Sequence, residues 1–371
     1  MILVCGHNCA WQLTYRFDAV TPGAVNRVRE VHRSAAGKGV NVARVLAALQ
    51  APATLLAYLG GPNGARVRQA LEREGIPAEV IDTAADTRTC VTLLESAGPV
   101  NEPAEPALTG SFGEFAGGAV GETQQVTELV EPAVTANDAE QERFAAAYDR
   151  LLEQASVVVV AGSAIGGARD EVYAEMVRRA HRRGVATLLD AYHGHGRAAL
   201  AAAPSIVKIN RAELAALAGT AVDAGPARIA VYRDLCDRYG VRWVIVSAGA
   251  EGIEACDGRR LLRAAAPAVP VVNSIGSGDA ASAGVAAALI GAAGGSTTGV
   301  ASGPNTAPGA PPPPLRIDQA ELAAVVRFAA ACGTANCLTP TPGSVTHEAI
   351  LRLHAQVAVT EASLGARRRI T

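Results

Sequence analysis

Aromatic residues and methionine are scarce in this chain. Phe, Trp and Tyr make up 4% of its 371 residues, and only two residues are methionine. A chain of this length can bury a substantial core, so that core must consist mostly of Ala, Val and Leu. The sequence also lacks any run of about 18 apolar residues, so it predicts no membrane span. The formal net charge of −2 provides no electrostatic attraction to nucleic acid or to an anionic membrane.

The seven cysteines are odd in number and scattered, and no Cys-x-x-Cys pair occurs. This spacing is typical neither of a disulfide framework nor of a zinc site. The first residues, M-I-L-V-C-G-H-N, lack a basic segment followed by a long apolar one, so we expect no signal peptide. A reduced, cytoplasmic protein is the simplest interpretation.

Strand and helix patterns alternate along the chain from about Phe144 onward. This alternation predicts an α/β fold with a doubly wound, mostly parallel sheet and helices on both faces. The segments at 10–35 and 88–130 contain short alternating strands instead. We expect them to pair as a small antiparallel sheet that covers the site.

Two segments break the pattern. Residues 97–125 are rich in Gly, Ala, Glu, Pro and Thr without a clear period, and residues 291–314 end in four consecutive prolines. Such composition does not favour regular structure. We expect both segments to be excursions or loops.

The most informative stretch is N-S-I-G-S-G-D-A-A-S-A-G, which begins at Asn273. It follows the apolar run Ala268–Val272, for which we predict a strand, and it leads into a buried helix over Ala280–Ile290. The turn between them consists of Gly276, Ser277 and Gly278. Glycines permit a tight turn and close approach of a ligand, and the free N–H groups of a first helical turn attract phosphate.

Asp279 follows this turn directly. A carboxylate would repel a bound phosphate, so it is an odd choice for binding alone. It suits a general base that takes a proton from a hydroxyl attacking the phosphate. The alternative is an ordinary turn in which Asp279 caps the helix.

A second candidate group lies in A-G-K-G-V-N, where a glycine turn opens a helix. Gly37 permits close backbone approach, Lys38 supplies a cation, and Asn41 supplies two donors and an acceptor. The segment is not a P-loop, because Lys38 is followed by Gly39 rather than by Ser or Thr. The alternative is an ordinary helix start.

A third group is Asn210-x-x-Glu213, directly after a predicted strand. The pair has the spacing of a capping box, and it could equally help to hold water around a nucleotide-bound magnesium ion. Arg27 and Arg88 are either contacts for a substrate phosphate or solvated charges on strands.

Taken together, these blocks make the sequence resemble the PfkB carbohydrate-kinase family of the ribokinase-like fold, and more narrowly its 1-phosphofructokinase and tagatose-6-phosphate kinase branch. N-R-V-R-E-V-H-R-S-A-A-G-K-G-V-N-V-A-R-V-L resembles the first family signature, and N-S-I-G-S-G-D-A resembles the second. Supporting blocks such as T-R-T-C-V-T, K-I-N-R-A-E-L and V-S-A-G-A-E-G occur in the family's order. The resemblance implies a single kinase domain over residues 1–371.

The resemblance also implies roles. Asp279 would be the catalytic base, and the N–H groups of the preceding turn would form an anion hole. Asn210 and Glu213 would organise Mg-ATP without a direct protein ligand to the metal. The nucleotide site would be lined by Ser247, Gly249, Gly252 and Asn336, and the sugar phosphate would face Gln12, Arg27, Gly37, Lys38, Asn41 and Arg88. The small sheet would be the family's lid, which often serves as a homodimer contact.

Two departures concern the substrate half. Gln12 stands where the branch usually has an Asp that grips sugar hydroxyls, and Ala36 replaces the first glycine of Gly-Gly-Lys-Gly. Ile165 and Ile209 also replace prolines that the family has in turns after two strands. We therefore expect ATP-dependent phosphorylation of a sugar phosphate, with fructose 1-phosphate or tagatose 6-phosphate as the leading substrates. The alternatives are a kinase for an unphosphorylated sugar or nucleoside, and a non-catalytic relative that binds sugar or nucleotide.

Overall fold

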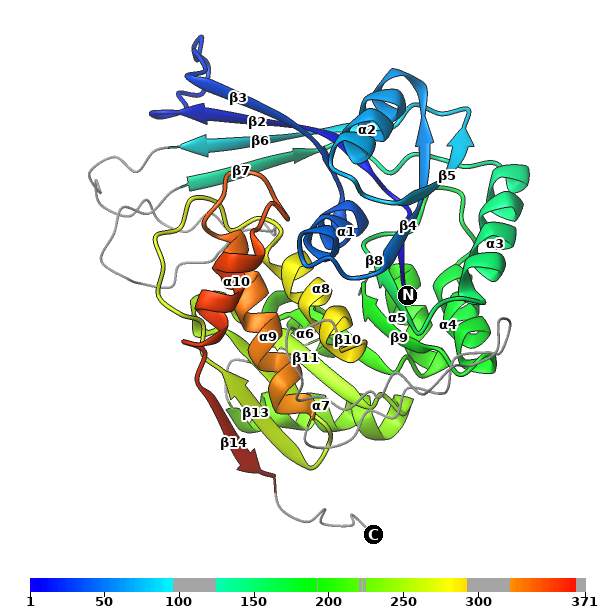
Figure 1. Ribbon diagram of the computed structural model, residues 1–371, viewed down its shortest axis with the longest axis vertical. Helices are drawn as coiled ribbons and strands as arrows, with labels where there is room; N and C mark the ends of the chain where they lie inside the picture. Colours follow the sequence, from blue (N-terminus) through cyan, green and yellow to red (C-terminus); the bar gives the residue numbers. More distant parts are fainter. Residues whose placement is uncertain (96–124, 192, 220–221, 223–224, 292–320, 365–371) are drawn as a thin grey trace.

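The computed structural model describes residues 1–95, 125–191, 193–219, 222, 225–291 and 321–364 (Figure 1). The predicted excursions at 97–125 and 291–314 lie outside these residues except for Gln125 and Gly291. Within the described residues, no helix is both long enough and apolar enough to cross a membrane.

A large sheet forms the centre of the molecule. Its strands run in the spatial order β14 (Val359–Ser363), β13 (Arg260–Ala264), β12 (Ile253–Cys256), β11 (Trp243–Ser247), β10 (Ile206–Asn210), β9 (Ala186–Asp190), β8 (Val157–Ala161), β1 (Ile2–Gly6), β4 (Ala53–Gly60) and β5 (Ala78–Thr83). The pairings from β11 to β5 are parallel, and those that add β12, β13 and β14 are antiparallel.

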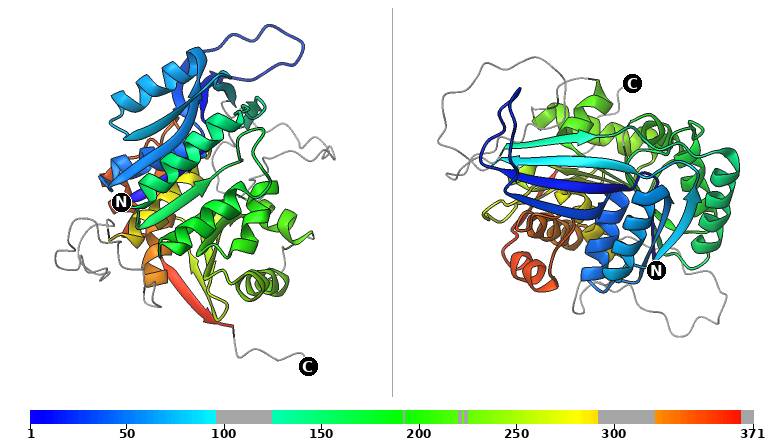
Figure 2. Two further views of the ribbon diagram at one scale, coloured as in Figure 1. Left: turned by 90° about the vertical axis from the view of Figure 1, so that its right-hand side faces the viewer. Right: turned by 90° about the horizontal axis from the view of Figure 1, so that it is seen from above.

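Helices cover both faces of this sheet, as predicted (Figures 1 and 2). Alternate residues of a central strand point to opposite cores: Ile2 and Val4 pack on one face, and Leu3 and Cys5 on the other. The first face carries α1 (Lys38–Ala48), α2 (Gly61–Arg73), α8 (Ser277–Leu289), α9 (Glu321–Asn336) and α10 (His347–His354). The second carries α3 (Asp138–Leu152), α4 (Val172–Arg182), α5 (Gly194–Ala199), α6 (Arg211–Ala218) and α7 (Gly225–Tyr239). Two short 3-10 turns, η1 (Leu200–Ala202) and η2 (Gly249–Glu251), complete the helical elements of the described residues.

The two segments expected to form a lid do pair as a second sheet, in the order β3 (Glu30–Ala36), β2 (Ala10–Phe17), β6 (Arg88–Glu95) and β7 (Gln125–Val130). The outer pairings are antiparallel, but β2 and β6 are parallel. Each of these two strands directly follows a strand of the large parallel sheet, β1 or β5, so both leave it in the same direction. We call this sheet the lid.

Three local predictions were wrong or incomplete. Residues 268–272 form no strand, because Pro267 and Pro270 interrupt the run; the N–H groups of Val272 and Asn273 bond instead to the carbonyl of Cys337. The expected turn G-G-P-N-G is the start of α2, where proline is tolerated. The strands β5 and β14 were not predicted, because both are mostly exposed or half-buried and carry little periodicity.

Candidate active site

The candidate site lies where the parallel strands β9, β10 and β11 end (Figure 1). Asp190, Asn210 and Ser247 are the last residues of these three strands. Helix α8 packs across them, and Ser282 of α8 donates a 2.6 Å hydrogen bond to Asp190. The carboxyl ends of parallel strands are the usual place for ligands in an open α/β sheet.

The glycines before α8 are required by close contacts. Gly276 has a left-handed φ of 82°, and a Cβ there would lie 2.8 Å from Cβ of Pro342. A Cβ on Gly278 would lie 2.8 Å from Nζ of Lys208. A buried lysine therefore sits directly against the backbone of the turn.

The N–H groups of this turn are partly committed. The N–H of Ser277 donates to the carbonyl of Ser274 at 3.2 Å. In the described part of the chain, nothing accepts from the N–H groups of Gly278 and Asp279. The free donors of the first helical turn thus lie one residue later than the sequence suggested.

Asp279 is not a helix cap, because Gly276 occupies the N-cap position. Its side chain is 6% exposed and accepts a 2.8 Å hydrogen bond from Nδ2 of Asn41. Burial raises the pKa of Asp279 to about 6; Asp190 adds to this rise, whereas Lys38, Lys208 and the Asn41 bond oppose it. A carboxyl group with this pKa is ionised at neutral pH and is basic enough to accept a proton.

Asp190 is the centre of a buried charge cluster. It is fully buried and accepts hydrogen bonds from Lys38 (2.8 Å), Lys208 (3.1 Å) and Ser282 (2.6 Å). Burial by itself would raise the pKa of Asp190, but the two ammonium groups outweigh it and hold the pKa well below its ordinary value. We call Asp190, Lys38, Lys208 and Ser282 the Asp190 cluster.

Lys38 joins the two halves of the site. Its side chain is 34% exposed, and its Nζ lies 3.7 Å from Glu213 in addition to its bond with Asp190. Burial opposes its charge, but Asp190, Glu213 and Asp279 raise the pKa of Lys38 overall. The ammonium group is therefore held in its charged form.

Asn210 and Glu213 form a reciprocal capping box at the start of α6, with both bonds at 2.8 Å. The box uses one carboxylate oxygen of Glu213 and leaves the other facing Lys38. The capping interpretation is confirmed. Oxygen donors remain for water around a hard cation, although the described residues contain no group of three or more His, Cys, Asp or Glu side chains that could hold a metal directly.

The residues predicted to line a nucleotide site divide into two kinds. Ser247 lies beside Asn210 in the sheet register, and the η2 loop between Gly249 and Gly252 follows it. Gly252 has a φ of 96°, and a Cβ there would lie 2.0 Å from the carbonyl of Ala264, so this position requires glycine for packing.

Asn336 differs from the other three because it is completely buried. Its amide donates to the carbonyl of Ile275 (2.8 Å) and to Oγ of Ser277 (3.1 Å), and it accepts from the N–H of Gly343 (2.7 Å). Asn336 therefore fastens the turn before α8 to the 337–346 loop and presents no free surface.

Among the predicted substrate residues, Gly37 and Gln12 lie at the base of the lid. Gly37 precedes α1 with a φ of 115°, and a Cβ there would lie 2.7 Å from the carbonyl of Asn8. Gln12 is 7% exposed, and its Nε2 donates to Oγ1 of Thr92 at 2.9 Å on the neighbouring strand.

The two arginines have separate positions. Arg88 begins β6 beside the start of β2 and donates to the carbonyl of Glu131 at 3.0 Å. Arg27 is exposed in the connection between β2 and β3, at the far end of the lid (Figure 1). The structure does not bring Arg27 to the other site residues.

Sequence reasoning missed Asp190, Lys208 and Arg44. Each leaves a signal in the sequence: Asp190 ends the apolar run V-A-T-L-L, Lys208 interrupts the strand I-V-K-I, and Arg44 interrupts the helix V-A-R-V-L. A charge inside a buried run must be paired. That rule would have marked all three positions.

Comparison with known proteins agrees with this geometry. The model of the pfkB family carbohydrate kinases matches residues 6–103 and 118–349. A "putative phosphofructokinase" from Staphylococcus aureus is 25% identical, with a TM-score of 0.68 over 98% of this chain and 99% of that one. Phosphofructokinase-2 from Escherichia coli, solved with substrates and products, is 21% identical, with a TM-score of 0.73 over 96% and 98% of the two chains.

A third structure, of a possible 1-phosphofructokinase from Thermotoga maritima, is 18% identical, with a TM-score of 0.73 over 98% of this chain and 99% of that one. At these lower identities the likeness establishes the ribokinase-like fold, and the family match covers most of the chain. The chain belongs to the pfkB family of carbohydrate kinases and is an ATP-dependent sugar kinase.

Proposed function

We propose that this kinase transfers the γ-phosphoryl group of ATP to a hydroxyl of a hexose phosphate, of the fructose 1-phosphate or tagatose 6-phosphate type. The observation that carries the proposal is the placement of Asp279. It is a buried carboxylate at the start of a helix whose free N–H groups face the same end of the sheet, and its pKa is raised to about 6. This arrangement suits proton abstraction beside an anion site.

In this mechanism Asp279 accepts the proton of the sugar hydroxyl as its oxygen attacks the phosphorus. Asn41 orients the carboxylate through its 2.8 Å hydrogen bond. The N–H groups of Gly278 and Asp279 stabilise charge on the transferring phosphoryl group, and Lys208 adds a fixed positive charge behind them. Lys38 holds its ammonium group at the mouth of the Asp190 cluster.

ATP supplies the phosphoryl group, and its magnesium ion neutralises phosphate charge. The donor set fits that ion, because Asp190, Glu213 and Asn210 offer the oxygen atoms that magnesium prefers, directly or through water. Ser247 and the η2 loop extend from Asn210 and would bind the nucleotide. Asn336 would act indirectly, by holding the turn before α8.

A phosphorylated substrate is favoured by two observations. The solved relatives are phosphofructokinases by their titles, and one E. coli structure is a complex with fructose 6-phosphate. In this chain Lys38 is committed to carboxylates, so Arg88 is the stronger candidate for the phosphate of the sugar. Gln12 would hydrogen-bond the sugar hydroxyls without adding charge.

The test is an ADP-release assay with Mg-ATP against fructose 1-phosphate, fructose 6-phosphate, tagatose 6-phosphate, free ketohexoses, ribose and nucleosides. We expect turnover with a phosphorylated hexose only, and a loss of about 10³-fold in Asp279→Asn with ATP binding retained. Turnover confined to a neutral sugar or nucleoside would contradict the substrate class. Sugar binding without any turnover would identify a non-catalytic relative.

We also propose that the lid pairs with a second copy of this chain. Leu13, Val91 and Leu129 lie side by side on one face of the lid, and Leu129 is 56% exposed. An exposed apolar row on a sheet with a free edge strand is a surface that proteins usually cover. Sedimentation should show a dimer that Leu129→Lys converts to a monomer; a monomeric parent would contradict the proposal.

A further inference from the structure

Arg44 lies in the middle of α1 and is 7% exposed. All five N–H groups of its guanidinium have acceptors. Nε and Nη2 donate to the carboxylate of Glu74 at 2.5 and 3.2 Å, Nη2 also donates to the carbonyl of Ala35 at 2.7 Å, and Nη1 donates to the carbonyl of Pro342 at 2.7 Å. The remaining contact, at 3.4 Å, joins Nη1 to Oδ1 of Asn41.

These acceptors belong to different parts of the site. Ala35 is in β3 at the base of the lid, and Glu74 is the C-cap of α2. Pro342 is the residue whose side chain excludes a Cβ at Gly276, in the turn before Asp279. Arg44 therefore ties the lid, α2 and the loop behind this turn to a single point on α1.

Asn41 lies one helical turn before Arg44, on the same face of α1. Its amide stands between two charges of opposite sign. Oδ1 faces the guanidinium, and Nδ2 donates to Asp279. A flipped amide would turn its NH₂ group toward a cation and its oxygen toward a carboxylate, which is unfavourable at both ends.

We propose that Arg44 is a positioning residue that fixes the side-chain amide of Asn41, so that its NH₂ group always faces Asp279. The inference rests on the proposed function, in which Asp279 is the base. It goes further by making the orientation of that base depend on a residue that contacts neither sugar nor nucleotide. The same guanidinium holds the lid carbonyl of Ala35, so the lid base and the base catalyst share one anchor.

The first readout does not require turnover. The carboxyl carbon of Asp279 is titrated by NMR in protein labelled with ¹³C-aspartate, and Asp279→Asn assigns the signal. The charged groups that face Asp279 are Lys38 from α1, Asp190 from β9 and Lys208 from β10, and all of them stay in place. Because the Asn41 bond favours the ionised carboxylate, its loss in Arg44→Lys should move the midpoint upward by about half a pH unit or more.

A double-mutant cycle shows whether the effect passes through Asn41. In an Asn41→Ala background, Arg44→Lys should add no further shift, and kcat should fall about tenfold in the Asn41-containing protein only, with KM for ATP unchanged. Arg68→Lys is the matched control, because Arg68 also pairs with a carboxylate, Asp82, from the neighbouring helix α2. It should match the parent.

Arg44→Met/Glu74→Gln removes the buried cation together with its carboxylate partner, which avoids an unpaired charge if Arg44→Lys folds poorly. It should show the same upward shift. An unchanged midpoint, an equal shift in the Asn41→Ala background, or a failure of both variants to fold would overturn the inference and leave Arg44 a structural residue. A parent without turnover that still shows the coupled shift would overturn the proposed function and keep the inference.

Discussion

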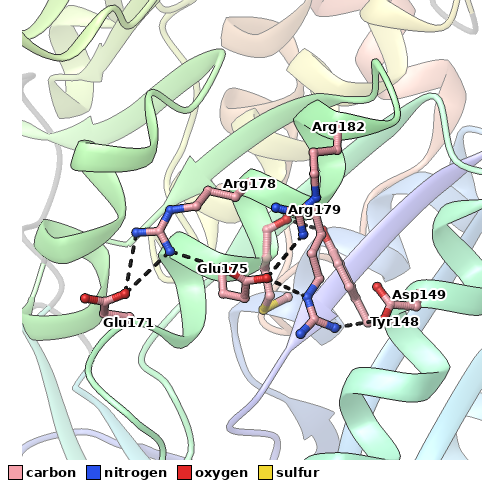
Figure 3. A network of polar contacts seen from close by, with 8 residues as sticks. Tyr148, Asp149, Glu171, Glu175, Arg178, Arg179 and Arg182 are labelled. Atoms are coloured by element: carbon pink, nitrogen blue, oxygen red, sulfur yellow. Dashed lines mark hydrogen bonds and ion pairs between the residues drawn. The ribbon is translucent and has the colours of Figure 1, made fainter.

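Two groups of charged side chains use the same ion pairs in opposite surroundings. On the outer side of α4, Arg178, Arg179 and Arg182 surround Glu175, and neighbouring carboxylates extend the network (Figure 3). These side chains remain in contact with water; that of Arg182 is 63% exposed. Each such pair contributes roughly 0 to 1 kcal/mol, because water screens it and ordering two long side chains costs entropy.

The Asp190 cluster has no such solvent. Asp190 is fully buried, and the side chain of Lys208 is 3% exposed. Removing charges from water is costly, and only pairing offsets that cost. Pairing stabilises the α4 network a little, but it is a condition for the Asp190 cluster to exist, and a protein accepts this cost where the charges serve chemistry.

The largest expected effect is on Asp190. Asp190→Asn would leave Lys38 and Lys208 facing each other without a buried carboxylate, and we expect it to lower the free energy of unfolding by about 3 to 5 kcal/mol. Urea unfolding of the variant and the parent at pH 7 measures this loss.

Asp149→Asn is the matched control, because Asp149 accepts a 2.8 Å ion pair from Arg179 but is 42% exposed. It should cost less than about 1 kcal/mol. Similar losses in the two variants would remove the distinction between the two regions.

Asp279→Asn is expected to act in the opposite direction. The pKa of Asp279 rises from 3.8 to about 6 on folding. Its contribution to stability is therefore present below pH 3.8 and lost as the pH rises through 6, where the buried carboxylate ionises. Replacing it should raise the free energy of unfolding by about 2 kcal/mol at pH 8 and by much less at pH 4.

Unfolding curves of Asp279→Asn and the parent at both pH values provide the test. A variant that is inactive and more stable at pH 8 would show that the carboxylate is kept for chemistry. A destabilised variant at pH 8 would instead place Asp279 among the structural charges.

The same pKa sets the acidic limb of the rate. A base must be ionised to accept a proton, so kcat/KM should fall about tenfold between pH 7 and pH 5 if the group titrates near 6. A sugar phosphate also titrates near pH 6. The limb should therefore persist with any slow unphosphorylated acceptor; its disappearance there would assign it to the substrate.

How far the sequence predicts this molecule depends on the element. The alternation from Phe144 onward predicted the doubly wound sheet, and the short alternating segments predicted the lid, because backbone periodicity follows burial directly. The strand over 268–272 was wrong because composition suggested a strand where prolines remove its donors.

The site was predicted where residues are adjacent in sequence and missed where they meet only in space. The glycine turn and Asp279 form one continuous motif, so both were found. Asp190 and Lys208 lie on separate strands, and only the parallel packing of β9 and β10 joins them at 3.1 Å. Asn336 was placed near the right turn, but its complete burial follows from the path of the 337–346 loop, which has no sequence signature.

The smallest expected effect is at Glu175, where the comparison is most exposed to error. Hydrogen bonds from Arg179 and its neighbours lower the pKa of Glu175, which suggests a strong site, but its side chain is 34% exposed. Screening by water should therefore limit the cost of Glu175→Gln to less than about 1 kcal/mol, and 1 M salt should reduce it further. Urea unfolding at low and high salt measures both quantities. A salt-independent loss above about 2 kcal/mol would mean that three arginines around one carboxylate act as a unit, and that burial alone does not separate the two regions.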